Sequence, residues 1–282
     1  MRLIVDAGAS KCHWALIENK NLIWEYESIG INPMFQSDDL IHEVIESFIS
    51  TQNLFNSTLE DIVYFGAGCG QTKMQERMKN LFLKFFPKAK HIEIHSDLLG
   101  AAIASCKDKE GISCILGSGS NACFFDGKQI QQSLPSLGYL LGDEGSGFSI
   151  GKDIIKAYAY EQMPEYLRED FRRSYSKELS QIIREIYQES RPNKYLASFC
   201  LFAKKHQTEP WIHSLISSHF SAFLQIHILP LKSKYPEAEL HFSGSVAWQF
   251  QEILQSNVKV LNFNICSITQ KPLSGLLEYY LM

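Results

Sequence analysis

Residues 1–17 read MRLIVDAGASKCHWALI, and they combine an apolar run, a turn of small residues and a second apolar run. The first run, residues 3–5, predicts a short strand that ends at Asp6. Residues 7–10 predict a turn, and residues 12–17 predict a second strand that follows it directly. A strand, turn and strand in this order differ from the strand-to-helix start of a dinucleotide-binding fingerprint. The chain therefore begins with a hairpin that is followed by an α/β pattern.

The same order returns about one domain later in the sequence. Residues 114–116 are apolar, residues 117–120 are glycine and serine only, and residues 122–125 are apolar again. The repeat lies in the order of elements rather than in residue identities, and it favours two domains of like fold. The polar stretch 107–111 separates the copies, so we predict an N-terminal domain at 1–110 and a C-terminal domain at 111–271.

Apolar periodicity predicts the other elements of the chain. Strands are expected at residues 22–26, 62–65, 92–95 and 240–242, and helices at residues 38–50, 72–86, 97–105, 145–161, 174–189, 195–206 and 211–235. Strands that alternate with helices favour a largely parallel sheet with helices on its faces. The fold class predicted from the sequence is α/β.

Composition excludes several classes of protein. The chain has 282 residues, a net charge of -4 and 45% hydrophobic residues, which excludes a disordered or collagen-like protein. A pI near 6.1 gives no general attraction to nucleic acid or to anionic membranes. The sequence contains no apolar run long enough to span a membrane, and an acid at position 6 argues against a signal peptide. We expect a cytoplasmic protein whose oligomeric state is left open, a homodimer included.

The seven cysteines are scattered and include no C-x-x-C pair. Such cysteines are typical of reduced, small core residues rather than of a disulfide framework or a metal cluster. The histidines have no metal-ligand spacing either, so we expect ordinary core or surface roles for them.

Three Gly/Ser turns each follow an apolar strand, at residues 6–11, 117–121 and 243–245. Small residues let backbone N–H groups approach a phosphate, and serine hydroxyls add donors. Each turn could also be an ordinary strand connection. Asp6 ends the first strand, and its carboxylate could hold Mg²⁺ beside the phosphates. The sequence lacks the pattern G-x-x-x-x-G-K-[ST], which argues against a P-loop NTPase.

Three further segments carry polar side chains, each of which has a structural and a functional interpretation. Asp97 stands where a strand ends and a helix begins, so it is either a helix N-cap or a base that accepts a proton from a substrate hydroxyl. The segment 142–147 reads GDEGSG, and its paired acids Asp143 and Glu144 suit hydrogen bonds to sugar hydroxyls, although they could cap a helix. Asn32, before Pro33, is either a turn residue or an amide partner for a ligand.

Taken in order along the chain, these segments resemble the sugar kinase, Hsp70 and actin superfamily of ATP-binding folds. More narrowly, they resemble its N-acetylglucosamine kinase branch, grouped with the BadF/BadG/BcrA/BcrD ATPase family. The resemblance covers essentially the whole chain, and residues 142–146 are its most specific part. It implies two ribonuclease H-like domains with a nucleotide cleft between them, and a terminal helix at about 272–282 that packs back on the first domain.

The resemblance also implies roles for individual residues. It makes Asp97 the catalytic base, Asn32 the partner of the N-acetyl group, and Asp143, with Glu144 beside it, an acid that holds sugar hydroxyls. It implies ATP and Mg²⁺ as cofactors, with Asp6 at the metal. The residues expected to contact the nucleotide are Asp6, Gly8, Ala9, Ser10, Lys11, Gly117, Ser118, Gly119, Ser120, Gly244, Ser245 and Gly275, of which Ser118 also reaches the substrate.

This sequence departs from the family pattern at three places. Ala7 replaces a glycine in the first loop, Ser118 replaces a threonine, and Ser136 with Leu137 replaces a Gly-Trp pair in the wall of the sugar pocket. We therefore expect transfer of a phosphoryl group from Mg·ATP to an N-acetylated amino sugar. The first-choice substrate is N-acetylglucosamine, at its 6-hydroxyl. N-acetylmuramic acid or glucosamine is the alternative substrate. A BadF-type ATPase activator with an iron–sulfur cluster and a non-catalytic sugar-binding regulator are the alternative functions.

Overall fold

The computed structural model describes residues 1–52, 59–189 and 191–281, and the chain divides into two compact units. Unit 1 comprises Met1–Ser113, Phe125–Gln131 and Lys271–Met282, and unit 2 comprises Cys114–Phe124 and Gln132–Gln270. The boundary expected at 110/111 lies at the start of strand β6 (Glu110–Leu116), three residues before unit 2 begins. Each unit is described by itself below.

A five-stranded mixed sheet forms the centre of unit 1, with the strand order β3-β2-β1-β4-β5. Its strands are β1 (Arg2–Ala7), β2 (Lys11–Glu18), β3 (Asn21–Ile29), β4 (Asp61–Gly66) and β5 (His91–Ser96). The first three strands pair in an antiparallel way, and β1, β4 and β5 pair in parallel. The predicted opening hairpin and the parallel pairing after it are therefore confirmed.

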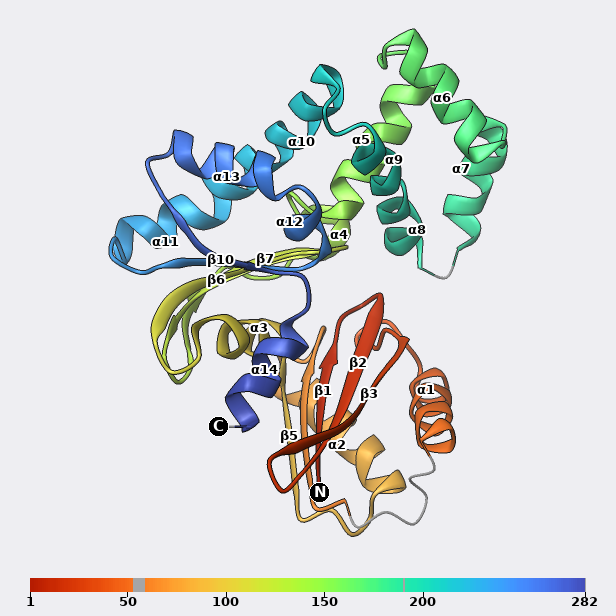
Figure 1. Ribbon diagram of the computed structural model, residues 1–282. Coiled ribbons are helices and arrows are strands. Elements are labelled where there is room, and N and C mark those ends of the chain that lie inside the picture. The colour runs from red at the N-terminus through yellow and green to blue at the C-terminus, as the bar shows by residue number, and fades with distance from the viewer. Residues whose placement is uncertain (53–58, 190, 282) are drawn as a thin grey trace. The chain divides into compact units, whose positions relative to one another are not determined.

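Helices cover both faces of this sheet (Figure 1). Helices α1 (Asp38–Thr51) and α2 (Thr72–Phe85) pack on one face, and α3 (Asp97–Cys106) and α14 (Pro272–Leu281) pack on the other. Side chains of β1 alternate between the two cores, because successive residues of a strand point to opposite faces. Leu3 and Val5 join the core under α1 and α2, while Ile4 joins the core under α3 and α14.

The second sheet has the order β10-β9-β6-β7-β8, which repeats the connectivity of the first. Besides β6, it contains β7 (Ser120–Asp126), β8 (Ile130–Ser133), β9 (Leu240–Ser243) and β10 (Ile265–Thr269). In each sheet the first strand is central, the second and third lie to one side of it, and the fourth and fifth lie to the other. The repeat predicted from the two glycine turns is confirmed at the level of topology.

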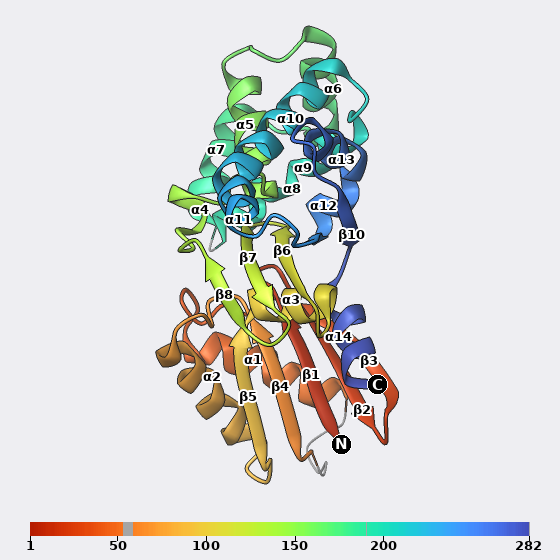
Figure 2. The same cartoon turned by 90° about the vertical axis from the view of Figure 1, so that its left-hand side faces the viewer.

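Unit 2 carries most of the helices (Figure 2). They are α4 (Gly138–Leu141), α5 (Gly147–Ala159), α6 (Glu165–Tyr175), α7 (Leu179–Gln188), α8 (Pro192–Ser198), α9 (Cys200–Lys205), α10 (Pro210–Phe223), α11 (Leu229–Lys234), α12 (Ser245–Gln249) and α13 (Gln251–Val260). Buried rings of Phe171, Phe199 and Phe202 pack together among α6, α8 and α9.

Two expectations about elements need correction. The single helix expected at residues 211–235 is interrupted by a π-helical turn, Leu224–Ile228. Pro230 has no N–H to donate to the carbonyl of Ile226, which explains why the regular ladder fails just before it. The helix expected at residues 195–206 is divided into α8 and α9, and the helices α4, α6, α12 and α13 and the strands β8 and β10 were not expected. The strand β10 escapes prediction because it lacks a run of buried apolar residues.

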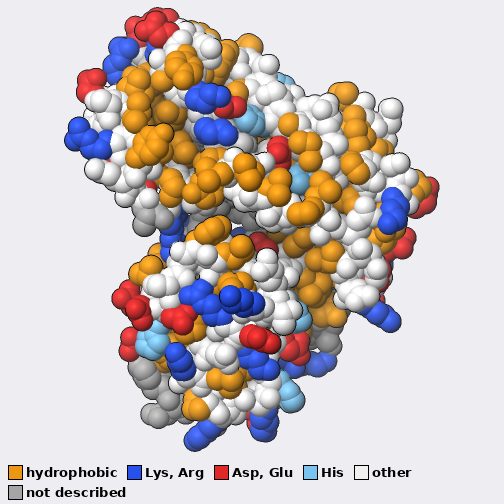
Figure 3. Space-filling model, turned by 180° about the vertical axis from the view of Figure 1, so that it is seen from behind, with side chains coloured by type: hydrophobic (Ala, Val, Ile, Leu, Met, Phe, Trp, Pro, Cys, Tyr) orange, Lys and Arg blue, Asp and Glu red, His pale blue; other side chains and the backbone are white. Residues whose placement is uncertain are grey.

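Surface and core agree with the composition. Six of the seven cysteines are buried, as expected for small core residues, and Cys266 is exposed. On the face drawn in Figure 3, Lys and Arg side chains are interspersed with Asp and Glu. Among the described residues, no helix is both long enough and apolar enough to cross a membrane.

Candidate active site

Asp6 and Asp97 lie at the same edge of the unit 1 sheet. Asp6 is level with Phe65 of β4, and Phe65 is level with His95 of β5, so the carboxyl ends of the three parallel strands are aligned. Asp97 follows β5 directly as the first residue of α3. Open α/β sheets bind ligands at this edge, outside the carboxyl ends of their strands.

The Asp6 carboxyl group is buried, with only 7% of the residue exposed. Its pKa is raised from 3.8 to about 7, mainly by burial and then by the negative charge of Asp97, while the backbone N–H of Leu273 opposes both effects. Two carboxylates near each other in a buried place repel, and a cation between or beside them would relieve that repulsion. The pair therefore suits a divalent cation chemically.

His13 lies beside Asp6. Its Nδ1 lies 3.8 Å from Asp6 Oδ2, but burial and then the charge of Lys271 lower the pKa of the imidazole. The other ring nitrogen lies 3.1 Å from Glu27 Oε2. Lys11, expected at the phosphates, places its Nζ 2.5 Å from Glu27 Oε1. In this structure the cation of Lys11 is thus engaged by Glu27.

Asp97 is not the N-cap that one reading of the sequence proposed. Ser96 is the cap of α3, and its Oγ accepts a hydrogen bond from the N–H of Leu99 at 3.2 Å. The Oδ1 of Asp97 accepts from the N–H of Leu98 at 2.9 Å. Because the capping role belongs to its neighbour, a structural need for a cap does not account for the acid at position 97.

Asn32 lies in a tightly bonded turn of unit 1. Its Oδ1 accepts a hydrogen bond from the N–H of Met34 at 3.0 Å, and its own N–H donates to Gln36 Oε1 at 2.5 Å. The turn role that the sequence offered is therefore present. The guanidinium of Arg77, from α2, fastens this turn by donating to the carbonyls of Pro33 and Gln36.

A glycine-rich loop, residues 66–70, connects the surroundings of Asn32 with those of Asp97. Gly68 has φ +80°, and a Cβ built on it would lie 2.3 Å from Asn32 Oδ1. Burial, and then the charge of Asp97, raise the pKa of the next residue, Cys69, to about 12. Sequence reasoning missed this loop and Arg77, although three glycines in five residues after a strand were an available signal.

The first predicted phosphate loop, residues 8–11, lies against Gly30. The N–H of Gly30 donates to the carbonyl of Ser10 at 3.0 Å. A Cβ on Gly30 would come within 2.4 Å of the carbonyl oxygen of Gly8 and 2.5 Å of the Ala9 backbone. The loop is therefore fixed by close backbone packing.

In unit 2, the second predicted phosphate loop is bonded to the start of α5. The N–H of Gly147 donates to the carbonyl of Gly117 at 2.8 Å, and the N–H of Phe148 donates to the carbonyl of Ser118 at 3.3 Å. Ser146 caps the helix by accepting from the N–H of Ser149. The first three N–H groups of α5 are therefore occupied by partners within unit 2.

Asp143 contacts that loop from the GDEGSG turn. Its Oδ1 accepts from the N–H of Ser120 at 3.2 Å, and a Cβ on Gly119 would lie 3.1 Å from its Oδ2. The backbone of Asp143 has φ 62°, which non-glycine residues adopt rarely. Burial raises the pKa of this carboxyl group, the N–H of Ser120 lowers it, and Glu144 raises it. The hydroxyl of Ser120 is buried with no hydrogen-bond partner among the described residues.

Glu144 points to the π-helical turn rather than to Asp143. Its Oε2 lies 3.4 Å from Nε2 of His227, whose ring stacks on Phe223. Burial lowers the pKa of His227, while Glu144 opposes that shift. Sequence reasoning missed His227, because the contact spans 83 positions.

Gly244 lies against the same loop in unit 2. It has φ 111° and ψ 162°, a backbone region that only glycine adopts readily. A Cβ there would lie 2.5 Å from the carbonyl oxygen of Leu116. Unit 2 therefore brings together three predicted segments: the loop at 117–120, the acids at 143–144 and the turn at 243–245, of which Ser245 is exposed.

Gly275 has a packing role in unit 1. A Cβ on it would lie 2.2 Å from the carbonyl oxygen of Ala104, so it allows α14 to approach α3 closely. Its own carbonyl accepts from Nζ of Lys107 at 2.6 Å. The terminal helix thus packs on unit 1, and close helix contact is sufficient reason for this glycine.

One cavity, of about 460 Å³, lies at the opposite edge of the unit 1 sheet, where β1, β4 and β5 begin. Arg2, Asp61 and His91 line it. It contains none of the predicted site residues, and the amino ends of parallel strands are not where such folds bind ligands.

No protein-family model and no curated protein sequence matches this chain. Solved structures do. A candidate N-acetylglucosamine kinase from Porphyromonas gingivalis is 35% identical, with a TM-score of 0.93, over 100% of this chain and 99% of that one. A candidate N-acetylglucosamine kinase from Chromobacterium violaceum has a TM-score of 0.76 at 14% identity, with 100% and 98% covered.

The fold is shared more widely. A ROK family glucokinase from Streptomyces griseus, solved with glucose and AMPPNP, has a TM-score of 0.61 at 11% identity, over 99% of this chain and 97% of that one. At such identities the likeness concerns the fold alone, and it confirms the α/β class with two domains of the sugar kinase type. With 35% identity to the Porphyromonas gingivalis protein over 100% of this chain and 99% of that one, the chain belongs to the same N-acetylglucosamine kinase family.

Proposed function

We propose that the protein transfers the γ-phosphoryl group of ATP to the 6-hydroxyl of N-acetylglucosamine. The observation that carries the proposal is the position of Asp97 at the carboxyl edge of the unit 1 sheet, near Asp6 and free of the capping task that Ser96 performs. A carboxylate there can accept the proton of an attacking hydroxyl. Membership of a kinase branch supports this reading.

The proposed roles divide between the two units. In unit 1, Asp97 accepts the proton from the sugar hydroxyl and orients its oxygen, and Asn32 contacts the N-acetyl group. In unit 2, the small-residue loop at 117–120 and the Ser120 hydroxyl, which has no hydrogen-bond partner among the described residues, suit phosphate oxygens. Gly244 and Ser245 contact the adenosine, and Asp143 with Glu144 contacts sugar hydroxyls. Phosphoryl transfer needs mainly positioning and charge stabilisation, which these groups supply.

Asp6 would hold Mg²⁺. Its donor is a carboxylate oxygen, the type that Mg²⁺ prefers, and its buried position beside Asp97 suits a cation. When bound, the ion neutralises charge on the phosphates. A cytoplasmic location is a prediction that accompanies this role.

The identity of the sugar is the finer part of the proposal. The turn that contains Asn32 is held by Arg77, and the Asn32 Oδ1 accepts from the N–H of Met34, so an amide at position 32 would be presented in a fixed orientation. A fixed amide suits recognition of an acetamido group, which favours N-acetylglucosamine over glucosamine. N-acetylmuramic acid shares the acetamido group and is the closest competitor.

The test is a coupled assay of ADP release with N-acetylglucosamine, glucosamine, N-acetylmuramic acid and glucose, each with Mg·ATP. The expected result is fastest turnover of N-acetylglucosamine, with the phosphate on the 6-hydroxyl of the product by NMR. Turnover of glucosamine at an equal kcat/KM would contradict the proposed substrate. ATP turnover with none of the sugars, although a sugar binds, would favour the regulator instead.

A further inference from the structure

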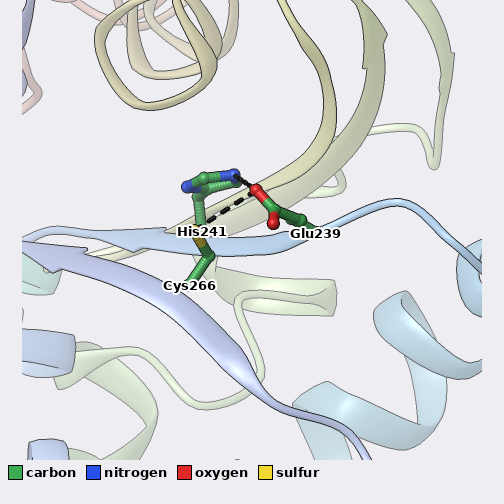
Figure 4. A group of neighbouring side chains, drawn as sticks. All are labelled: Glu239, His241 and Cys266. Carbon is green, nitrogen blue, oxygen red and sulfur yellow. Dashed lines mark hydrogen bonds and ion pairs between the residues drawn. The ribbon is translucent and has the colours of Figure 1, made fainter.

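Three side chains with metal-binding atoms meet on the second sheet, away from the residues discussed so far. Glu239 directly precedes β9, His241 lies in β9, and Cys266 lies in β10 (Figure 4). Their ligand atoms all lie within 4.8 Å of one another. Glu239 Oε2 is 3.8 Å from Nε2 of His241 and 3.3 Å from Sγ of Cys266. Since zinc bonds measure about 2.0–2.3 Å, one ion can reach all three atoms.

An irregularity in strand pairing brings Cys266 into this group. Leu240 pairs with Ile265, whereas the next residue, His241, pairs with Ser267. Cys266 is therefore an extra residue in β10, and such a bulge bends the strand and redirects side chains. Because β10 is an edge strand, the redirected thiol is exposed to solvent.

His241 is already held in an orientation that suits a ligand. The residue is buried, with 6% exposed, and its Nδ1 lies 2.8 Å from Oγ of Ser267. When Nδ1–H donates to that hydroxyl, the lone pair of Nε2 faces Glu239 and Cys266. Metal-binding histidines commonly donate their second ring N–H to an oxygen in this way, which fixes both the tautomer and the ring.

We propose that Glu239, His241 and Cys266 form a binding site for a divalent cation of the zinc class. A thiolate and an imidazole select zinc over magnesium or calcium, which prefer oxygen ligands. Three protein ligands leave a fourth tetrahedral position for water. Bound there, the ion links the edge strand β10 to β9 and stabilises the folded protein. The site is independent of the proposed sugar kinase activity.

The test measures zinc binding to the full-length, reduced, chelator-treated protein by competition with a chromophoric chelator. A single Zn²⁺ per chain is expected, and saturation should raise the melting temperature. Co²⁺ in its place should give a thiolate-to-metal charge-transfer band, which reports a cysteine ligand directly. Cys266→Ser should abolish the band and weaken Zn²⁺ binding at least about tenfold, since even the loss of an outer-shell partner costs roughly 10–100-fold.

Cys266 and Glu239 are both exposed, so Cys266→Ser and Glu239→Gln are expected to fold. Glu239→Gln should also weaken Zn²⁺ binding, while Glu237→Gln, at an exposed acid two residues away, should leave it unchanged. A Co²⁺ spectrum without a thiolate band, or an unchanged Zn²⁺ affinity in Cys266→Ser, would overturn the proposal. Binding of a cation through carboxylates elsewhere, such as Asp6, would give no thiolate band and would survive Cys266→Ser.

Discussion

The two units place different kinds of chemistry on sheets of the same strand order. In unit 1 the candidate site consists of charged side chains, Asp6 and Asp97, at the ends of parallel strands. In unit 2 it consists mainly of backbone: Gly119 and Gly244 each lie where a Cβ would crowd a neighbour, and Asp143 bonds a backbone N–H. Under the proposed function, unit 1 would supply the reacting groups and unit 2 a phosphate-binding surface. Substitutions in the two units should therefore fail in different ways.

The largest effect is expected for Asp97→Asn in unit 1. Asparagine has the same size and can still accept the N–H of Leu98, so the start of α3 is preserved. Loss of the proton-accepting carboxylate should lower kcat by roughly 10²–10⁴-fold. The measurement is kcat at saturating sugar and ATP, with a thermal melt of both proteins.

Ser96→Ala is the matched control for that variant. It removes the hydroxyl that accepts the N–H of Leu99 and should cost about 1 kcal/mol of unfolding free energy while kcat stays near that of the wild type. Two variants at neighbouring positions would thus have separate effects, Asp97→Asn on kcat and Ser96→Ala on the unfolding free energy. An Asp97→Asn protein that melts normally and keeps most of its kcat would remove the assignment of Asp97 as the base.

The next largest effect, on the unfolding free energy and on the KM for ATP, is expected for Gly244→Ala in unit 2. The new Cβ would meet the carbonyl oxygen of Leu116 at 2.5 Å, and the backbone conformation itself disfavours alanine. Strain of this kind costs about 1–3 kcal/mol. Because the distortion reaches the loop after Leu116, the KM for ATP should rise as well. Urea unfolding and ATP kinetics measure the two effects.

Gly70→Ala in unit 1 provides the comparison, because no atom lies within 4 Å of a Cβ built there. It should leave the unfolding free energy unchanged or slightly higher, as expected where a glycine conformation is open to alanine. Equal losses in the two variants would show that the backbone at Gly244 carries no special constraint.

Local patterns were sufficient to predict much of this structure. Both opening hairpins, the helix that starts at Asp97 and the turn around Asp143 depend on residues close in sequence, and the structure has all of them. The choice between cap and base at Asp97 could not be made locally, because both Ser96 and Asp97 are good capping residues. Only the observed bond from Leu99 assigns the cap to Ser96.

Contacts between segments that are far apart in the chain could not be predicted from the sequence. His227 contacts Glu144 from a π-helical turn that precedes Pro230. Arg77 contacts the turn at Asn32 from helix α2. The group of Glu239, His241 and Cys266 depends on one extra residue in an edge strand, which no spacing rule encodes. The spacing of the histidines in the sequence could not show this group, because the register of β9 and β10 brings its members together.

A smaller effect, on the preference between acetylated and non-acetylated sugars, is expected for Asn32→Asp in unit 1. Aspartate keeps the oxygen that accepts the N–H of Met34, so the turn survives, but it lacks the amide donor. If that donor contacts the acetyl carbonyl, the ratio of kcat/KM for N-acetylglucosamine over glucosamine should fall about tenfold or more. An unchanged ratio would mean that Asn32 serves only the turn.

The smallest effect concerns the scaffold of unit 2, where α5 carries the GDEGSG turn at its start. Oδ2 of Asp153 in α5 lies 3.2 Å from Nε2 of His219 on α10, and the interaction with His219, followed by the hydrogen bond from Lys156, lowers the pKa of Asp153 from 3.8 to about 2. Asp153→Asn should therefore lower the unfolding free energy at pH 7. The full shift corresponds to roughly 2 kcal/mol, and solvent screening of a carboxylate that is a third exposed reduces it to about 1 kcal/mol.

The dependence on pH has a definite sign. A depressed pKa stabilises the folded protein at pH values above the unfolded pKa of 3.8, and this stabilisation is lost as the pH falls toward about 2. Urea unfolding of the wild type and of Asp153→Asn between pH 7 and pH 2 should give curves that converge at the acidic end. Lys156→Ala, which removes an exposed ion pair, should cost only a few tenths of a kcal/mol. A constant difference between the curves at all pH values would mean that packing, and not the charge of Asp153, connects α5 to α10.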